Sequence, residues 1–139
     1  MRLAAASLLV ATLALAGCGK TATTPTDTTP QIFTELYAGT LSTNGSGFYS
    51  FTVSVEGTVK VTLASLAVNA GGPPIATVLG IGLGIPSGTG CSLMTQQNVT
   101  PGLVAQLTKD LIPSIYCVKI FDVGNLSGTV NFAVRIAHP

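Results

Sequence analysis

Apolar side chains recur at every second position in several parts of this sequence, and this period is the feature that most restricts the fold. It occurs in four segments, at positions 49–55, 59–63, 116–120 and 130–136. A period of two places the apolar groups on one face of an extended strand, so each segment predicts a half-buried β-strand. Glu56 and Gly57 join the first two segments by a tight connection, which predicts a β-hairpin.

The remaining strands are predicted from β-prone composition rather than from strict alternation. They cover 32–41, the aliphatic and glycine-rich segment 75–85, and a weaker stretch at 96–107. Seven or eight strands without a helical pattern favour an all-β fold, an antiparallel β-sandwich or jelly roll. Its core is expected to hold four aromatic rings, those of Tyr49, Phe51, Tyr116 and Phe132.

Gly80, Gly82 and Gly84 alternate with aliphatic residues inside the glycine-rich segment. Their spacing differs from the G-x-G-x-x-G pattern of a dinucleotide-binding loop, and Pro86 prevents a helix from starting smoothly after them. We therefore predict a bent core strand, in which the missing side chains let the opposing sheet or a bulky aromatic ring approach closely.

Residues 1–16 carry one positive charge, on Arg2, followed by an uncharged run of leucine, alanine and valine. This order is typical of a secretory signal peptide. The run is shorter than the ~20 apolar residues that a transmembrane helix needs, and it is interrupted at residues 17–20. We therefore predict that residues 1–17 are a cleaved signal and not a membrane span.

Leu15-Ala16-Gly17-Cys18 resembles the lipobox of bacterial lipoproteins, in which an aliphatic residue and two small residues precede a cysteine. The resemblance implies that Cys18 receives a thioether-linked diacylglycerol, that the signal is cut just before it, and that the new amino group is then acylated. Gly19 stands where many Gram-negative inner-membrane lipoproteins carry aspartate, which implies the outer membrane, on its periplasmic or surface side. The alternative is a plain secretion signal with an accidental cysteine.

Residues 18–31 are rich in threonine and proline and contain few apolar groups, which predicts a tether that holds the domain at 32–139 away from the bilayer.

Charged residues make up 8% of the chain. The sequence has six basic and five acidic side chains, and the loss of Arg2 with the signal leaves five of each. Without a surplus of lysine and arginine, the protein is not expected to bind nucleic acid through charge.

Cys91 and Cys117 are the cysteines that remain in the domain once Cys18 carries the lipid. An exported chain meets an oxidising compartment, and two thiols allow a single intramolecular pairing. We predict a disulfide that joins a loop after the glycine-rich strand to the penultimate strand. The alternative is a redox or metal-binding pair, which lacks the C-x-x-C spacing and the histidines that such sites use.

Residues 48–63 read F-Y-S-F-T-V-S-V-E-G-T-V-K-V-T-L, residues 115–126 read I-Y-C-V-K-I-F-D-V-G-N-L, and residues 130–139 read V-N-F-A-V-R-I-A-H-P. With the glycine-rich strand and the cysteine between them, these motifs resemble the bacterial pre-peptidase C-terminal domain over most of residues 32–139. That family consists of β-sandwiches appended to secreted proteases, where they assist secretion, localisation or substrate contact. The resemblance implies an orphan copy of this domain, fixed to a membrane and not accompanied by a peptidase.

His138 is the sole histidine, and its place next to the last residue predicts a frayed, solvent-facing side chain rather than a catalytic base. No G-x-S-x-G nucleophile motif accompanies it. The carboxylates are dispersed along the sequence, at Asp27, Glu35, Glu56, Asp110 and Asp122. We therefore predict that the protein is not an enzyme.

Asp122 and Asn125 are candidate ligands for Ca²⁺, because D-V-G-N offers hard oxygen atoms close together. The alternative, which we favour, is an Asx-type turn shaped by the Asp122 side chain. No other metal or cofactor is expected.

Tyr37, Phe48 and Phe121 are candidate surface rings for binding carbohydrate.

These features together predict a membrane-anchored, non-enzymatic envelope lipoprotein whose β-sandwich is a binding or structural accessory module. Its expected partners are the membrane, through the lipid, and an envelope protein or a polysaccharide. A carbohydrate-binding module on the cell surface is the first alternative. A calcium-dependent accessory domain for a secreted hydrolase is the second.

Overall fold

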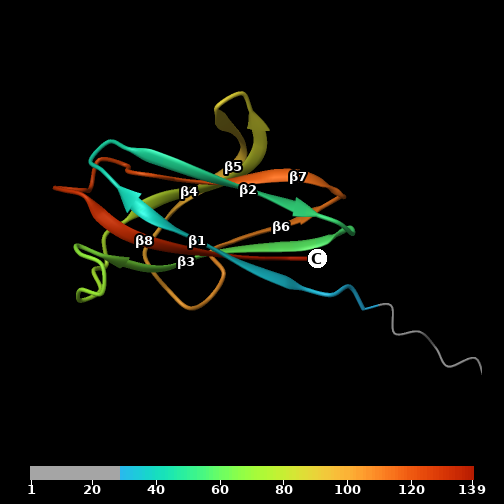
Figure 1. Cartoon of the computed structure of the whole chain (residues 1–139), viewed down its shortest axis with the longest axis horizontal. Coiled ribbons are helices and arrows are strands. Elements are labelled where there is room, and N and C mark those ends of the chain that lie inside the picture. The colour runs from blue at the N-terminus through green and yellow to red at the C-terminus, as the bar shows by residue number, and fades with distance from the viewer. Residues whose placement is uncertain (1–28) are drawn as a thin grey trace, which may run out of the picture.

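A computed structural model describes residues 29–139 of the chain (Figure 1). The predicted signal at 1–17, the lipidation site Cys18 and most of the tether lie outside the described residues. No helix in the described part is long and apolar enough to cross a membrane.

The described chain folds into eight strands and no helix, and the strands form two four-stranded antiparallel sheets. Sheet A has the order β1-β8-β3-β6 and sheet B the order β2-β7-β4-β5. The strands are β1 (Phe33–Leu41), β2 (Ser46–Val53), β3 (Gly57–Ala67), β4 (Leu79–Ser87), β5 (Gly90–Val99), β6 (Leu107–Leu111), β7 (Ser114–Phe121) and β8 (Val130–His138). This is the strand order of a jelly roll, so the predicted antiparallel sandwich of seven to eight strands is confirmed.

The β-hairpin predicted around Glu56 and Gly57 is wrong, because β2 belongs to sheet B and β3 to sheet A. The short connection instead carries the chain from one sheet to the other, and Val55, predicted to face the core, is exposed at this corner. Alternation identifies which face of a strand is buried, and both strands bury that face in the same core from opposite sides. Among the eight strands, β4 and β5 are the consecutive pair that forms a hairpin.

The core lies between the inner faces of the two sheets, where alternate residues of the central strands are buried. Of the rings predicted for it, Phe51, Tyr116 and Phe132 are buried and Tyr49 is half-buried. The completely buried aliphatic side chains include Val59, Val61 and Leu63 of β3, Leu79, Ile81 and Leu83 of β4, Val118 and Ile120 of β7, and Val134 and Ile136 of β8. These positions are the ones that the period of two assigns to the inside.

The three glycines of β4 lie on the outer face of sheet B, and atoms of the neighbouring strands approach each of them closely. A Cβ at Gly80 would collide with the Phe121 ring, and a Cβ at Gly82 would lie 2.7 Å from a methyl carbon of Leu93. The close approach of a bulky aromatic ring to this segment is therefore confirmed. The pairing of β4 with β5 shifts between Leu83 and Gly84, which marks a β-bulge.

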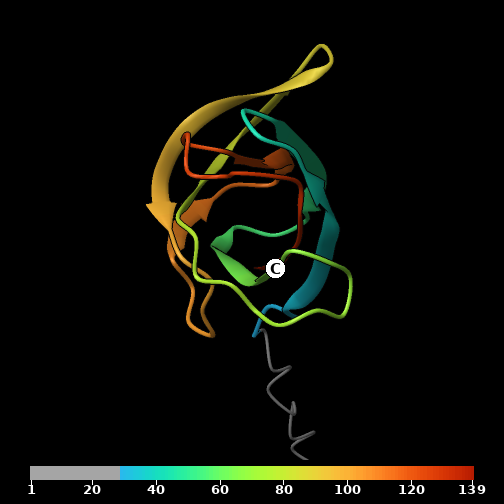
Figure 2. The same cartoon turned by 90° about the vertical axis from the view of Figure 1, so that its left-hand side faces the viewer.

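Cys91 and Cys117 form the predicted disulfide, with their Cα atoms 5.9 Å apart. Cys91 lies in β5 rather than in a loop, directly after the β4–β5 turn, and Cys117 lies in β7. The strand β4 separates β5 from β7 within sheet B, yet β4 pairs with β7 no further than Gly84. Beyond that residue the hairpin leaves the sheet, as the yellow projection in Figure 2 shows, and this bend brings Cys91 to Cys117.

Candidate functional site

A carboxylate and an imidazole meet where the edge strands β1 and β2 face each other. Glu35 lies on β1 and His138 at the end of β8, and Glu35 Oε1 is 2.9 Å from His138 Nε2. The His138 side chain is 5% exposed, so the prediction of a frayed, solvent-facing histidine is wrong. The inward alternation of β8 continues past Ile136 to position 138, and this continuation is the sequence signal for its burial.

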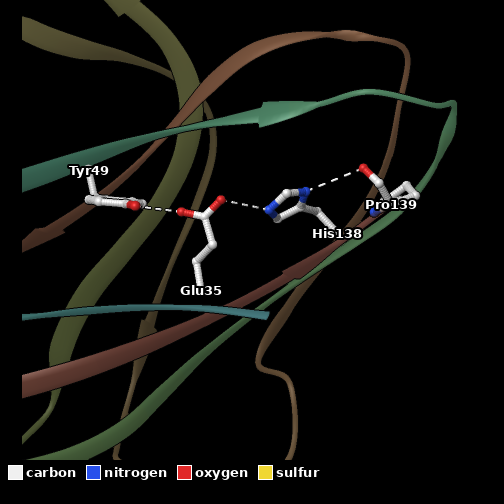
Figure 3. A network of polar contacts seen from close by, with 4 residues as sticks. All are labelled: Glu35, Tyr49, His138 and Pro139. Atoms are coloured by element: carbon white, nitrogen blue, oxygen red, sulfur yellow. Dashed lines mark hydrogen bonds and ion pairs between the residues drawn. The ribbon is translucent and has the colours of Figure 1, made fainter. Parts of the chain in front are cut away.

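The second oxygen of Glu35 accepts a hydrogen bond from the Tyr49 hydroxyl of β2, with an oxygen to oxygen distance of 2.5 Å. On the other side, His138 Nδ1 lies 3.3 Å from the backbone oxygen of Pro139. Figure 3 shows Tyr49, Glu35, His138 and Pro139 in one row between the sheets. Three strands from two sheets are thus joined by a single polar network, which we call the Glu35 clasp.

Aromatic rings surround the Glu35 clasp. Tyr37 stacks on Tyr49 with 5.5 Å between ring centroids and meets Phe132 edge to face at 5.0 Å. Phe51 lies 5.1 Å from the His138 ring. Glu35, through its hydrogen bond and its charge, raises the pKa of Tyr49, and burial raises the pKa of Tyr37. Both phenols therefore stay protonated at neutral pH, and the Tyr49 hydroxyl remains a hydrogen-bond donor.

The Glu35 clasp contains an acid and a base, but its contacts are internal. Both ring nitrogens of His138 have partners within the chain, and the Glu35 side chain, which is 31% exposed, presents both oxygens to His138 and Tyr49. A general acid or base has to reach a substrate proton at hydrogen-bond distance. In this arrangement the network closes the edge of the sandwich and satisfies buried polar groups.

Asp122, the candidate calcium ligand, accepts four backbone hydrogen bonds in the connection after β7. Its Oδ1 accepts from the N–H groups of Gly124, Asn125 and Leu126, and its Oδ2 accepts from Asn44 at 2.8 Å. The Asn125 side-chain nitrogen donates to the Val78 carbonyl at 3.1 Å. The Asp122 carboxylate thus forms an Asx-type turn and ties it to the β1–β2 connection. No group of three histidine, cysteine or acidic side chains that could hold a metal ion occurs within residues 29–139.

We expect D122N to make the fold less sensitive to acid. The N–H group of Asn44, and then those of Asn125, Leu126 and Gly124, hold the pKa of Asp122 below its usual 3.8 against the opposing effect of desolvation. A carboxyl with a lowered folded pKa stabilises the fold above its unfolded pKa, and this contribution is lost as pH falls through the folded pKa. Urea unfolding at a series of pH values should show a smaller loss of stability below about pH 4 in D122N than in the wild type. Superimposable pH profiles of D122N and the wild type would show that the Asp122 carboxylate does not stabilise the fold through these hydrogen bonds.

The three candidate carbohydrate-binding rings do not share one surface. Tyr37, expected to be a surface ring, faces inward against Tyr49 and Phe132, because the inner face of β1 includes position 37. Phe48 and Phe121 lie on the outer face of sheet B, where Phe48 is 38% exposed and Phe121 covers Gly80. Of the three candidate rings only Phe48 is exposed, so they do not form a platform.

Sequence reasoning missed the loop between β5 and β6. The predicted strand at 96–107 is wrong in its middle, because β5 ends at Val99 and β6 begins at Leu107. Residues 100–106 form a loop beside an open depression of about 510 Å³, with Leu103 86% and Val104 79% exposed. The Pro101-Gly102 pair is the turn signal that could have identified it.

The sequence matches no protein-family model and no curated protein. The resemblance to the pre-peptidase C-terminal domain therefore stays a prediction that rests on its motifs.

Proposed function

We propose that this chain is a lipid-anchored lipoprotein of the bacterial envelope, and that its jelly roll is a non-enzymatic binding or structural accessory module. The observation that carries the second part is the internal use of acid and base groups. Glu35 and His138 bind each other, Asp122 binds its own turn, and Asp110 accepts a hydrogen bond from the Thr58 hydroxyl at 2.6 Å. Large apolar side chains, in contrast, are exposed on the surface.

The anchor is supported by the agreement of three sequence features. A short apolar run follows one positive charge, a lipobox-like Leu15-Ala16-Gly17 precedes Cys18, and a threonine and proline-rich stretch separates Cys18 from the first strand. Acyl chains on Cys18 would hold the domain on a membrane without any spanning segment. The residue after Cys18, Gly19, favours the outer membrane as the destination by its likeness to sorted lipoproteins.

Replacing Cys18 with serine should abolish both signal cleavage and fatty-acid incorporation, because serine lacks the thiol that receives the lipid. We expect wild-type protein in the membrane fraction, labelled by radioactive palmitate, and unlabelled, uncleaved C18S precursor. The matched control is C91S/C117S, which removes the other two cysteines and should keep label and membrane association. Unchanged processing and labelling of C18S would refute the anchor.

The non-enzymatic role has its own test. A hydrolase activity of the pure protein that E35Q abolishes would refute it.

A further inference from the structure

The β5–β6 loop at residues 100–106 is hydrogen-bonded to β3, although its tip is apolar and exposed. Gly102 N donates to the Leu63 carbonyl at 2.9 Å, and Gln106 N donates to the Val61 carbonyl at 3.0 Å. The Gln106 side chain adds a hydrogen bond from Leu63 N to its amide oxygen, at 2.7 Å. The loop therefore continues the hydrogen bonding of β6 with β3 on both sides of its tip, while Leu103 and Val104 at the tip are exposed.

Arg135 fixes the same tip over the outer face of sheet A. Its Nη2 donates to the Leu103 carbonyl at 2.8 Å. Arg135 stands on β8 between Leu36 of β1 and Thr62 of β3, on the face that points away from the core. Leu36 is itself 65% exposed, so apolar side chains from the loop and from β1 flank one guanidinium group.

The chain enters the domain over this same face. Thr29, Pro30 and Ile32 line a depression of about 320 Å³ together with Lys60 and Ala137. Lys60 and Ala137 are direct partners on the outer face of sheet A, two positions along their strands from Thr62 and Arg135. In Figures 1 and 2 the orange β5–β6 loop and the blue start of the domain both lie on the lower side, away from the yellow hairpin.

The position of Cys18 restricts how far this face can be from a membrane. Ten residues lie between Cys18 and Thr29, so Thr29 is eleven chain steps from Cys18, a reach of about 40 Å at full extension. A lipid on Cys18 would therefore hold Thr29, and with it the adjoining part of the outer face of sheet A, within that distance of the bilayer surface. Apolar side chains beside cations are the combination that binds the interface of an anionic membrane. Lys60 and Arg135 supply the cations here, and Asp110, on the same face, is bound to Thr58.

We propose that Leu103 and Val104 insert into the headgroup region of the anchoring membrane, with Arg135 and Lys60 beside the lipid phosphates. The domain would then rest on the bilayer with sheet A facing it and the β4–β5 hairpin directed away. This inference depends on the proposed lipid anchor. It assigns the second membrane contact of the protein and leaves sheet B as the face that is free to meet other molecules.

A tryptophan at position 103 would test the contact, because the chain contains no tryptophan. Processed, lipidated L103W would be reconstituted into vesicles of phosphatidylethanolamine and phosphatidylglycerol, with and without bromine on the acyl chains. We expect L103W to lose most of its fluorescence in brominated vesicles. The matched control is I115W, which replaces a residue 56% exposed on the outer face of sheet B and should keep its fluorescence. V104W provides a second reporter if L103W does not fold.

Sedimentation of the same samples distinguishes the two proposals. If the protein sediments with the vesicles but bromine quenches neither loop reporter, or quenches I115W equally, the membrane contact is refuted while the anchor stands. A blue-shifted, unquenched L103W would likewise refute it, because a protein would then cover the loop. If the wild type does not sediment with the vesicles, the lipid anchor itself is refuted.

Discussion

G84A is expected to lower the free energy of unfolding by about 3 kcal/mol, because the added methyl group has no space. A Cβ at Gly84 would overlap the backbone oxygen of Ser92 and lie 2.7 Å from its carbonyl carbon. The obstacle is backbone, which cannot rotate away as a side-chain end can. The β4–β5 pairing at the bulge would have to open, and with it the bend that brings Cys91 to Cys117. Urea unfolding of the purified protein measures this loss.

G128A is the matched control for G84A. A Cβ at Gly128 would meet no atom within 4 Å, and its backbone is not among the glycines with positive φ. The same change of one methyl group should therefore alter the free energy of unfolding by no more than about 0.5 kcal/mol. Equal effects of G84A and G128A would show that the close approach of Ser92 does not limit this strand.

C91A/C117A is expected to lower the free energy of unfolding by about 3.5 kcal/mol relative to the oxidised protein. The bridge closes a loop with a sequence separation of 26, and a loop of that length removes this much entropy from the unfolded chain. A reducing agent should destabilise the wild type by a similar amount and leave the double variant unchanged.

Two observations would contradict the disulfide prediction. One is the detection of free thiols at Cys91 and Cys117 by mass mapping under non-reducing conditions. The other is a double variant that unfolds at the same urea concentration as the oxidised wild type.

The effects of G84A and C91A/C117A on the free energy of unfolding should combine to less than their sum, because both changes act on the same hairpin. A fully additive result would indicate that the bend at Gly84 and the bridge are independent.

The inner face of each strand could be predicted from the sequence, but the partners of the strands could not. The alternation of apolar residues is a property of a single strand, which has one face toward the core and one toward water. It correctly placed Val59, Tyr116 and Val134 inside. Pairing depends on contacts between segments far apart in the chain. For this reason the segments at 49–55 and 59–63, neighbours in sequence, could be expected to pair and yet lie in different sheets.

The candidate site likewise contains one feature that the sequence predicted and others that depend on contacts between distant segments. Counting cysteines was sufficient to predict the bridge between Cys91 and Cys117. The Glu35 clasp could not be predicted, because 103 positions separate Glu35 from His138 and only the pairing of β1 with β8 brings them together. The assumption that a residue near a terminus frays led to the wrong environment for His138, since β8 is paired on both sides up to Ala137.

The sequence by itself determined the all-β class, the buried face of most strands and the identity of the disulfide, because each follows from local period or from the number of cysteines. The tertiary structure decided the jelly-roll order, the Glu35 clasp, the hydrogen bond that ties the Asp122 turn to Asn44, and the apolar β5–β6 loop on the outer face of sheet A. Each of these depends on which distant segments pack together, and that choice is made by the free energy of the whole core rather than by any one segment.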